Sequence, residues 1–394
     1  MATRRTTTSE SPSKQTPPRL TIIGNPANRR VTMFQVALVA QGQPPARVVA
    51  WRDLAERPGA AAELLAEVAH DEHAVVRIDS AGEDDLVERA FLRRGEPLAR
   101  ARGFDAIDAA TLAALPYELG RIVYPRQTHL GFMHTVAEVG AALPGVRMLP
   151  PPSAIELLFD KAACSAAWQR AGIPVPDALP PARDPDHLRA LMRERDWPTV
   201  YVKLTCGSSA SCLAVFTHTA TGEHAITTVE DTGTARFNTR KLQRLTKRAA
   251  IDRTLGFILR EGAHVERSIP KAKLDGRYFD LRVLAVAGEA AFVVARTSPH
   301  PITNLHLGGL RGDVEALRAR VPRDAWDAAM ASCIAVQQSS GAFHVGVDLM
   351  FEPGFTAHRV IEGNAFGDLL PNLERDGLDV YGWQIAKLVA MVRA

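Results

Sequence analysis

Short apolar runs alternate with amphipathic stretches along the first part of the chain. The runs at residues 20–23, 47–51 and 74–78 have the length of buried strands, and apolar residues recur at helical spacing over 28–41 and 60–69. Strands that alternate with helices favour a parallel sheet with helices packed against it. The pattern therefore predicts an α/β domain with a parallel sheet in this part of the chain.

Three consecutive prolines at residues 150–152 mark the clearest boundary in the chain. Because proline interrupts helices and strands alike, we place an N-terminal domain at 19–150 and a second domain at 151–394. Residues 1–18 are rich in Thr, Ser and Pro and carry few apolar side chains, a composition typical of a disordered tail.

The second domain is predicted to begin with a helix that contains Phe159, Asp160 and Lys161, with Ser153 as its cap. A helix is expected next at 185–195. Strands at 200–204, 212–217 and 225–230 follow it and are expected to form a small sheet. We assign residues of about 175–263 to this subdomain. Further strands and a closing helix near 379–392 give the C-terminal part α+β character.

Residues 232–251 hold six basic side chains and no acidic one. Arg240, Arg244 and Arg248 recur at a spacing of four, which predicts one basic face of a helix. A solvated surface is the plainer interpretation of such a face, and a site for an acidic partner is the alternative. Phe237 is the single aromatic residue of this segment, so a nucleic-acid site that stacks bases has little support.

Composition and charge favour an ordinary globular protein that binds small ligands. The chain is 46% hydrophobic and 23% charged, and its formal net charge of +3 is far below that of a dedicated nucleic-acid binder. Apolar runs stay well short of the roughly 18 residues that a membrane span needs. The four cysteines form no C-x-x-C pair and have no histidines at zinc-binding spacing, which favours a reducing cytoplasm.

Three oxygen-bearing side chains, Asp348, Glu362 and Asn364, interrupt a predicted pair of apolar strands at 345–351 and 358–364. Glu362 and Asn364 share one face because side chains alternate along a strand. Asp348 lies opposite one of two successive positions on the other strand, depending on the register. Only the register that pairs Asp348 with Glu362 brings all three oxygen donors together, where they would suit Mg²⁺ bridging phosphates. A polar face exposed to solvent is the alternative.

Lys203 ends an apolar strand and precedes the small-residue segment Cys206–Ser211. A cation beside accessible backbone N–H groups can neutralise and cradle phosphate oxygens. The segment lacks the spacing of a P-loop, and a simple turn rich in Gly and Ser is the plainer interpretation.

Two arginines, Arg282 and Arg296, lie on a predicted hairpin that turns at Gly288-Glu289, with Asn304 and His306 just beyond it. Such a pair could clamp a carboxylate or stabilise a transferring phosphoryl group. A two-residue turn puts the two arginines on opposite faces, whereas a longer loop or a β-bulge puts them on the same face. The sequence leaves both arrangements open, and a structural role is the plainer interpretation of His306.

Taken in order, these segments resemble the ATP-grasp superfamily over roughly residues 150–394. Asp160-Lys161 with Ala171–Pro176 is similar to the helix that supplies the first ATP-binding lysine, and Lys203 with its loop is similar to the second lysine and the phosphate loop. His264–Ile269 resembles the segment that contacts adenine. The resemblance implies nucleotide binding by Lys161, Lys203, Gly207, Ser208, Ser209, Glu266 and Ile269, and Mg²⁺ binding, with Mn²⁺ as an alternative, by Asp348, Glu362 and Asn364.

The stretch from Asp280 to Arg282, followed by Arg296 and Asn304–Gly309, is most similar to the branch that adds glutamate to ribosomal proteins and related peptides. This similarity implies a carboxylate–amine ligase that forms a C–N bond through an acyl phosphate. Arg282 and Arg296 would be catalytic, with Asn304 and His306 near the substrate. The implied architecture is an N-terminal pre-grasp domain followed by an ATP-grasp fold of two lobes. In this architecture the subdomain at about 175–263 would act as a lid. The first 150 residues resemble only bacterial ATP-grasp proteins of unsettled function.

Three functions remain open at this point. The ligase would join a small-molecule or peptide carboxylate to an amine, whereas a small-molecule kinase would use the same lysines and metal ligands. A non-catalytic nucleotide-binding protein is the third interpretation. The sequence predicts no membrane partner, and it leaves a homo-oligomer open.

Overall fold

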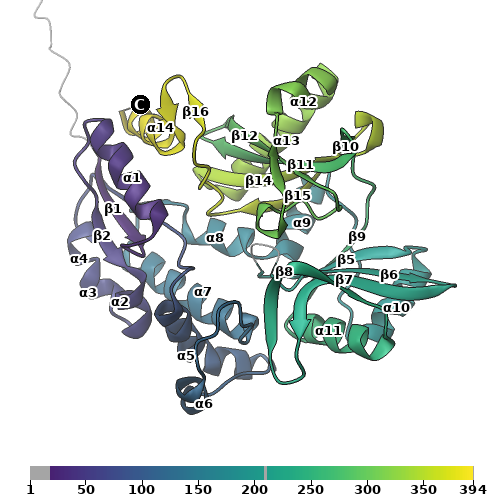
Figure 1. Cartoon of the computed structure of the whole chain (residues 1–394). Coiled ribbons are helices and arrows are strands. Elements are labelled where there is room, and N and C mark those ends of the chain that lie inside the picture. Colours follow the sequence, from purple (N-terminus) through teal and green to yellow (C-terminus); the bar gives the residue numbers. More distant parts are fainter. Residues whose placement is uncertain (1–17, 208–210, 394) are drawn as a thin grey trace, which may run out of the picture.

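The structure is a computed structural model that describes residues 18–207 and 211–393, the side chains of residues 306 and 393 excepted. The predicted tail at 1–18 lies outside the described residues apart from Pro18. Within the described residues, strands form a four-stranded, a five-stranded and a six-stranded sheet and a two-stranded hairpin. Figure 1 shows the N-terminal sheet on one side, the other two large sheets on the opposite side, and helices α8 and α9 between them.

The N-terminal sheet is parallel, in the order β2-β1-β3-β4, as the alternating pattern predicts. Its strands are β1 (Arg19–Gly24), β2 (Arg47–Ala50), β3 (Ala74–Ile78) and β4 (Arg147–Leu149). Its helices are α1 (Arg29–Ala40), α2 (Trp51–Glu56), α3 (Ala61–Leu64), α4 (Ala66–Ala69), α5 (Asp85–Ala101), α6 (Ala109–Ala114) and α7 (Pro125–Ala142). The single helix expected at 60–69 is wrong, because fully buried Leu65 takes φ −109° and ψ 7° and divides it into α3 and α4.

Helices α5 and α7 approach each other closely enough for their backbones to touch. A Cβ atom at Gly95 would lie 1.9 Å from the carbonyl oxygen of Gln127, and one at Gly131 would lie 1.9 Å from that of Phe91. Only glycine fits at either position. The two glycines therefore fix the spacing of α5 and α7.

The helix predicted around Asp160 is two helices, α8 (Pro152–Leu158) and α9 (Lys161–Arg170). Asp160 is the N-cap of α9, and its side chain accepts a hydrogen bond of 2.9 Å from the Ala163 N–H. The expectation that Ser153 caps this helix is wrong, because Ser153 lies inside the first turn of α8 behind Pro151. The break leaves Phe159 between the helices and puts Lys161 at the start of α9.

The five-stranded sheet is antiparallel, in the order β8-β7-β6-β5-β9. Its strands are β5 (Thr199–Leu204), β6 (Ala214–Thr219), β7 (Gly222–Asp231), β8 (Arg236–Leu245) and β9 (Ala263–Arg267), and α10 (Pro185–Glu194) and α11 (Arg248–Arg260) pack against it. The basic helix predicted over Arg240, Arg244 and Arg248 is wrong. The first two lie on β8, because the free edge of β7 supplies hydrogen-bond partners along this segment, and Arg248 begins α11.

Residues 120–122 join the outer edge of β8, so the N-terminal domain is clasped to the five-stranded sheet. The Ile122 N–H donates to the Arg236 carbonyl at 2.8 Å, and the Asn238 N–H donates to the Gly120 carbonyl at 2.7 Å. We call this pair of hydrogen bonds the clasp.

The six-stranded sheet is antiparallel and follows the order β13-β12-β11-β14-β15, with β10 paired to β11. Its strands are β10 (Lys273–Leu274), β11 (Arg277–Val286), β12 (Glu289–Ser298), β13 (Leu310–Gly312), β14 (His344–Phe351) and β15 (His358–Asn364). The remaining elements are α12 (Val314–Arg320), α13 (Arg323–Ser340), the 3₁₀ turns η1 (Leu305–Leu307) and η2 (Pro353–Phe355), the hairpin β16 (Glu374–Arg375) and β17 (Leu378–Asp379), and α14 (Val380–Arg393).

The C-terminal helix packs both on α1 of the N-terminal domain and on β12 of the large sheet (Figure 1). Tyr381 of α14 meets Phe34 of α1 edge to face, with ring centroids 5.7 Å apart. Beside them, both oxygens of fully buried Asp368 accept hydrogen bonds, from Arg30 at 2.8 Å and from Arg77 at 2.5 Å. Among the described residues, no helix combines the length and the apolar composition that crossing a membrane requires.

Candidate active site

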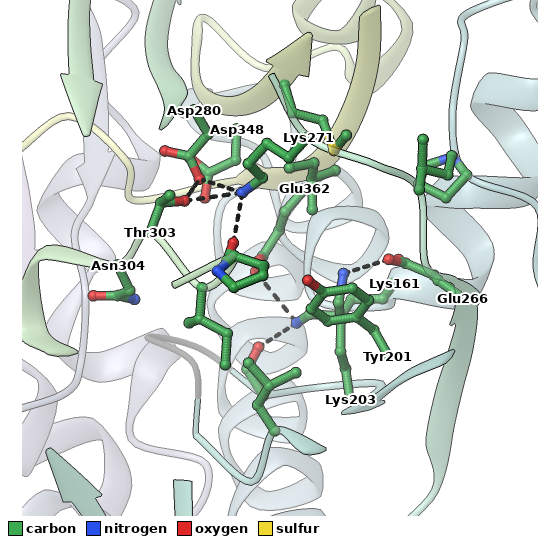
Figure 2. Close-up of a pocket in the computed structure, with 18 of the residues that line it drawn as sticks. Lys161, Tyr201, Lys203, Glu266, Lys271, Asp280, Thr303, Asn304, Asp348 and Glu362 are labelled. Carbon is green, nitrogen blue, oxygen red and sulfur yellow. Dashed lines mark hydrogen bonds and ion pairs between the residues drawn. The ribbon is translucent and has the colours of Figure 1, made fainter. Parts of the chain in front are cut away.

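The main cavity lies where β5 and β9 of the small sheet face β11, β14 and β15 of the large sheet (Figure 2). It encloses about 920 Å³ with its open mouth included, a size within the range of small-molecule sites. Its polar lining comes from both halves of the second domain: Lys161, Tyr201, Lys203, Glu266, Lys271, Asp280, Arg296, Thr303, Asn304, Asp348 and Glu362.

The two predicted lysines enter this cavity from different elements. Lys161, at the start of α9, lies with its Nζ 3.3 Å from a carboxylate oxygen of Glu362 and also donates to the Gly207 carbonyl. Lys203, near the end of β5, donates to Glu266 on the neighbouring strand β9. Both amino groups therefore lie within reach of one ligand.

Glu266 is a buried carboxylate that stays ionised. Burial by itself would raise its pKa, but the charge of Lys203 and a contact of 3.2 Å with the His264 ring outweigh burial and lower that pKa to about 2. The lysine and glutamate thus form a fixed ion pair on the cavity wall.

The strands β14 and β15 adopt the register that unites the predicted oxygen donors. Asp348 pairs directly with Glu362, and Gly346 pairs with Asn364, so the three side chains share one face of the sheet. A β-bulge next to Asp348 shifts the register beyond it. Asn364 also donates to the Gly346 carbonyl at 3.1 Å, which holds its amide in place.

A β-bulge also decides where the two arginines lie. The turn consists of Ala287 and Gly288, one residue earlier than predicted, and by itself would put Arg282 and Arg296 on opposite faces. A bulge opposite Leu284 and Ala285 adds one residue, Ala291, to β12 and reverses this relation, so both arginines point to the face that carries Asp348.

Arg282 and Arg296 both pair with Asp348. Arg282 binds both carboxylate oxygens, with 3.2 Å between its Nη2 and Oδ2, and Nη2 of Arg296 lies 3.2 Å from the same Oδ2. Burial opposes ionisation of this carboxyl, but the two guanidinium groups outweigh burial and lower its pKa to about 2. Arg296 also donates to Asp280 at 2.6 Å.

The remaining predicted residues have different outcomes. Gly207 and Ile269 line the main cavity, and Asn304 lines both this cavity and an adjoining one. Ser208 and Ser209 lie outside the described residues, and so does the side chain of His306, whose backbone belongs to η1. The adjoining cavity shares Arg296, Asp348 and Glu362 with the main one and adds Arg30, Arg282, Arg311 and Asn364.

Neither a family model nor a curated protein matches this chain. Solved structures do: D-cycloserine synthetase DcsG aligns with a TM-score of 0.52 and 14% identity, over 94% of this chain and 99% of that one. The ligase PsnB, complexed with minimal precursor, Mg and ADP, aligns with a TM-score of 0.51 and 14% identity, over 94% and 96%. D-alanine–D-alanine ligase from Bacillus anthracis, complexed with ATP, aligns with a TM-score of 0.50 and 10% identity, over 96% of each chain. The chain has an ATP-grasp fold.

The ATP-grasp resemblance and the mixed α/β architecture are thus confirmed. Identities of 10–14% show the fold alone, so the likeness to the glutamate-adding branch stays a prediction. The domain boundaries at 150 and 263 stay predictions as well.

Lys271 is a cavity residue that the sequence patterns did not predict. Its Nζ lies 3.0 Å from the Thr303 hydroxyl and 3.0 Å from the Pro301 carbonyl, at the wall of the main cavity (Figure 2). Burial lowers its pKa, although Asp280, 3.5 Å away, opposes that effect. Its place two residues after Ile269 is the signal that could have pointed to it.

Proposed function

We propose that this protein is an ATP-dependent ligase that joins a carboxylate to an amine through an acyl phosphate. The observation that carries the proposal is the convergence of Lys161 and Lys203 with the carboxylate pair Asp348 and Glu362 in one cavity. The fold supports it, because the matched proteins are named as ligases or a synthetase. Two of those structures are complexed with ATP or with Mg and ADP.

The nucleotide would occupy the main cavity. Lys161 and Lys203 would neutralise its phosphates, and the main chain at Gly207 would approach them closely. Glu266 and Ile269, from β9 and the segment after it, would line the base, with Ser208 and Ser209 completing the phosphate loop.

The donor set fits Mg²⁺. Asp348, Glu362 and Asn364 offer hard oxygen ligands on one face, and the two carboxylates now face cations that a metal can replace. Among the described residues, no three His, Cys, Asp or Glu side chains form a metal site by themselves, so the site would need Asn364 and the phosphates of the nucleotide. The metal would spread the charge of the phosphates, and Mn²⁺ prefers the same oxygen ligands.

In the proposed reaction, a carboxylate oxygen attacks the γ-phosphorus of ATP, and the bond from that phosphorus to the ADP oxygen breaks. Arg282 and Arg296 orient the carboxylate and then hold the acyl phosphate. The amine attacks the acyl carbon, phosphate leaves, and the amine loses a proton. Asn304, which lines both cavities, would contact the substrate beside the arginines, and His306 is proposed as a second contact.

Turnover in carboxylate and amine pools tests the reaction class. ADP and phosphate should appear in equal amounts only when both pools are present, and hydroxylamine should trap the intermediate as a hydroxamate. Stable transfer of phosphate to a hydroxyl compound, with no need for an amine, would establish the kinase instead. ATP binding without turnover in any pool would establish a non-catalytic nucleotide-binding protein.

The arginines can be tested separately from nucleotide binding. Arg282→Gln should lower turnover by about 100-fold or more, because a fixed cation beside the developing charge is lost, and should change the Kd for ATP little. Arg277→Gln, on the opposite face of the same strand, is the matched control and should keep its activity. Equal losses in both variants would remove Arg282 from the mechanism.

A further inference from the structure

A third cavity lies among α5, α7, the end of β5 and the turn after β15. Leu204, Gly207 and Ser211 line both this cavity and the main one, so the end of β5 separates the two. Four phenylalanines and a histidine supply its rings, and we call it the aromatic cavity: Phe91, His129, Phe132, Phe159 and Phe366. It encloses about 1030 Å³ with its mouth included, ample for a ring-bearing group.

The rings form one continuous wall. Phe159 lies at its centre, with its centroid 5.4 Å from that of Phe132 and 5.8 Å from that of Phe366. The His129 ring stacks on Phe159 at 6.1 Å with an interplanar angle of 18°. These are the distances at which aromatic rings attract one another, and a further ring beside the wall would find both faces and edges to contact.

The fold holds this wall rigidly. Phe91 and Phe132 come from α5 and α7, whose spacing is fixed by the backbone contacts at Gly95 and Gly131. Both rings also pack edge to face against buried Trp51. Phe159 is fixed in turn by the break between α8 and α9.

The wall is uncharged at neutral pH. Burial, followed by the charge of Arg126, lowers the pKa of His129 to about 4, so its imidazole is neutral. The charged lining residues are Glu88, on α5, and Arg121, in the segment that pairs with β8. A neutral, flat group therefore matches the wall better than a charged one does.

The aromatic cavity adjoins the cavity that contains the arginines. Ser80, Phe159, Gly207 and Phe366 line both. A ring bound against Phe159 and Phe366 would therefore lie next to the cavity that holds Arg282 and Arg296. Lys161, two residues after Phe159, faces the main cavity at the same time.

We propose that one of the two substrates carries an aromatic ring, which binds in the aromatic cavity while its carboxylate or amine lies at Arg282 and Arg296. The proposal rests on the ligase function proposed above and names the substrate class of that site. Aliphatic side chains of the same volume would lose the ring-to-ring contacts with Phe159 and Phe366.

Direct binding tests the proposal without turnover. The full chain, with Mg²⁺ and a non-hydrolysable ATP analogue, is titrated calorimetrically with phenylalanine, 3-phenylpropionate and 2-phenylethylamine, each beside its cyclohexyl counterpart. We expect at least one aromatic probe to bind about five- to ten-fold more tightly than its counterpart. Equal affinity within every pair, or no binding of any aromatic probe, would overturn the proposal.

Variants locate the bound ring. Phe366→Leu should remove most of the preference for the aromatic probe, whereas Phe355→Leu, a half-buried ring against the core of the large sheet, should keep it. An unchanged preference in Phe366→Leu would also overturn the proposal. Binding of an aromatic probe without ADP release in any carboxylate–amine pool would contradict the ligase function and leave the aromatic cavity standing, so the two failures are distinguishable.

Discussion

Glu266, Asp348 and Glu362 each face a cation that comes from another strand or helix. Lys203 forms an ion pair with Glu266, and Lys161 forms one with Glu362. Asp348 pairs with both Arg282 and Arg296. Paired in this way, Glu266 and Asp348 stay ionised although they are buried, because their cationic partners lower the pKa of each. The cavity therefore holds both signs of charge, close together and in fixed positions, before any ligand enters.

Glu362→Gln tests the carboxylate proposed to hold the metal. The variant should fold, because the amide keeps the shape of the side chain, yet turnover should fall by about 100-fold or more, because an amide oxygen binds Mg²⁺ weakly. The measurements are ADP release over a Mg²⁺ titration and the circular dichroism spectrum.

Glu352→Gln is the control for this variant, since that carboxylate lies beyond the end of β14, where it pairs with Arg359. Turnover close to that of the unmodified protein in Glu362→Gln, at ordinary Mg²⁺ concentrations, would remove Glu362 from the metal site.

At the same scale, sequence patterns singled out Lys203, Asp348 and Glu362, because each puts a charge within or at the end of an apolar strand, whereas Lys161 came from the family resemblance. Phe159 and Phe366 gave no such signal. A phenylalanine beside a buried helix or strand is expected in any core, and only the spatial meeting of α7 with the turn after β15 makes these two line a cavity.

At the scale of elements, one extra residue in β12, Ala291, decides which face of the sheet carries Arg296. Register is set by turns and bulges, and this bulge carries no distinctive sequence. The prediction of a helix from the spacing of four between Arg240 and Arg244 was wrong for a related reason. The hydrogen-bond partners that make this segment a strand belong to β7, which no local window of sequence includes.

The turn between β11 and β12 offers a test of this register. Ala287 and Gly288 have φ values of 47° and 83°, a conformation in which Asn-Gly is favoured over Ala-Gly. Ala287→Asn should therefore raise the free energy of unfolding by about 0.5–1 kcal/mol, because asparagine tolerates positive φ better than alanine does.

Urea denaturation measures that gain, and ADP release should stay unchanged, since Ala287 is exposed and does not line any of the three cavities described above. A loss of stability in Ala287→Asn would contradict the turn geometry. A gain of stability accompanied by a loss of activity would contradict the independence of turn and site.

At the scale of the whole molecule, buried charge ties the first and last parts of the chain together. Asp368 accepts from Arg30 and Arg77 of the N-terminal domain, and Gln384 of α14 contacts both Arg77 and Asp368. Alternating strands and helices predict the N-terminal sheet well. They contain no hint that α14 packs on α1, because that contact joins residues more than 300 positions apart.

Asp368→Asn should destabilise the protein by about 3–5 kcal/mol, because two arginines would lose a buried counterion. The midpoint of urea unfolding measures the effect, and Asp376→Asn, an exposed turn residue, is the control. A shift no larger than that of the control would show that the charge cluster contributes little to stability.

The clasp between residues 120–122 and β8 has a consequence for following this protein in solution. The amide protons of Ile122 and Asn238 are each bonded across the boundary between the N-terminal domain and the small sheet. If that sheet moves away from the N-terminal domain, both hydrogen bonds break and both amide protons become exposed to water together. Their rate of deuterium uptake, compared with that of amides inside β6, would therefore report how readily the small sheet separates from the N-terminal domain. The same measurement with ATP would show whether the nucleotide slows this opening.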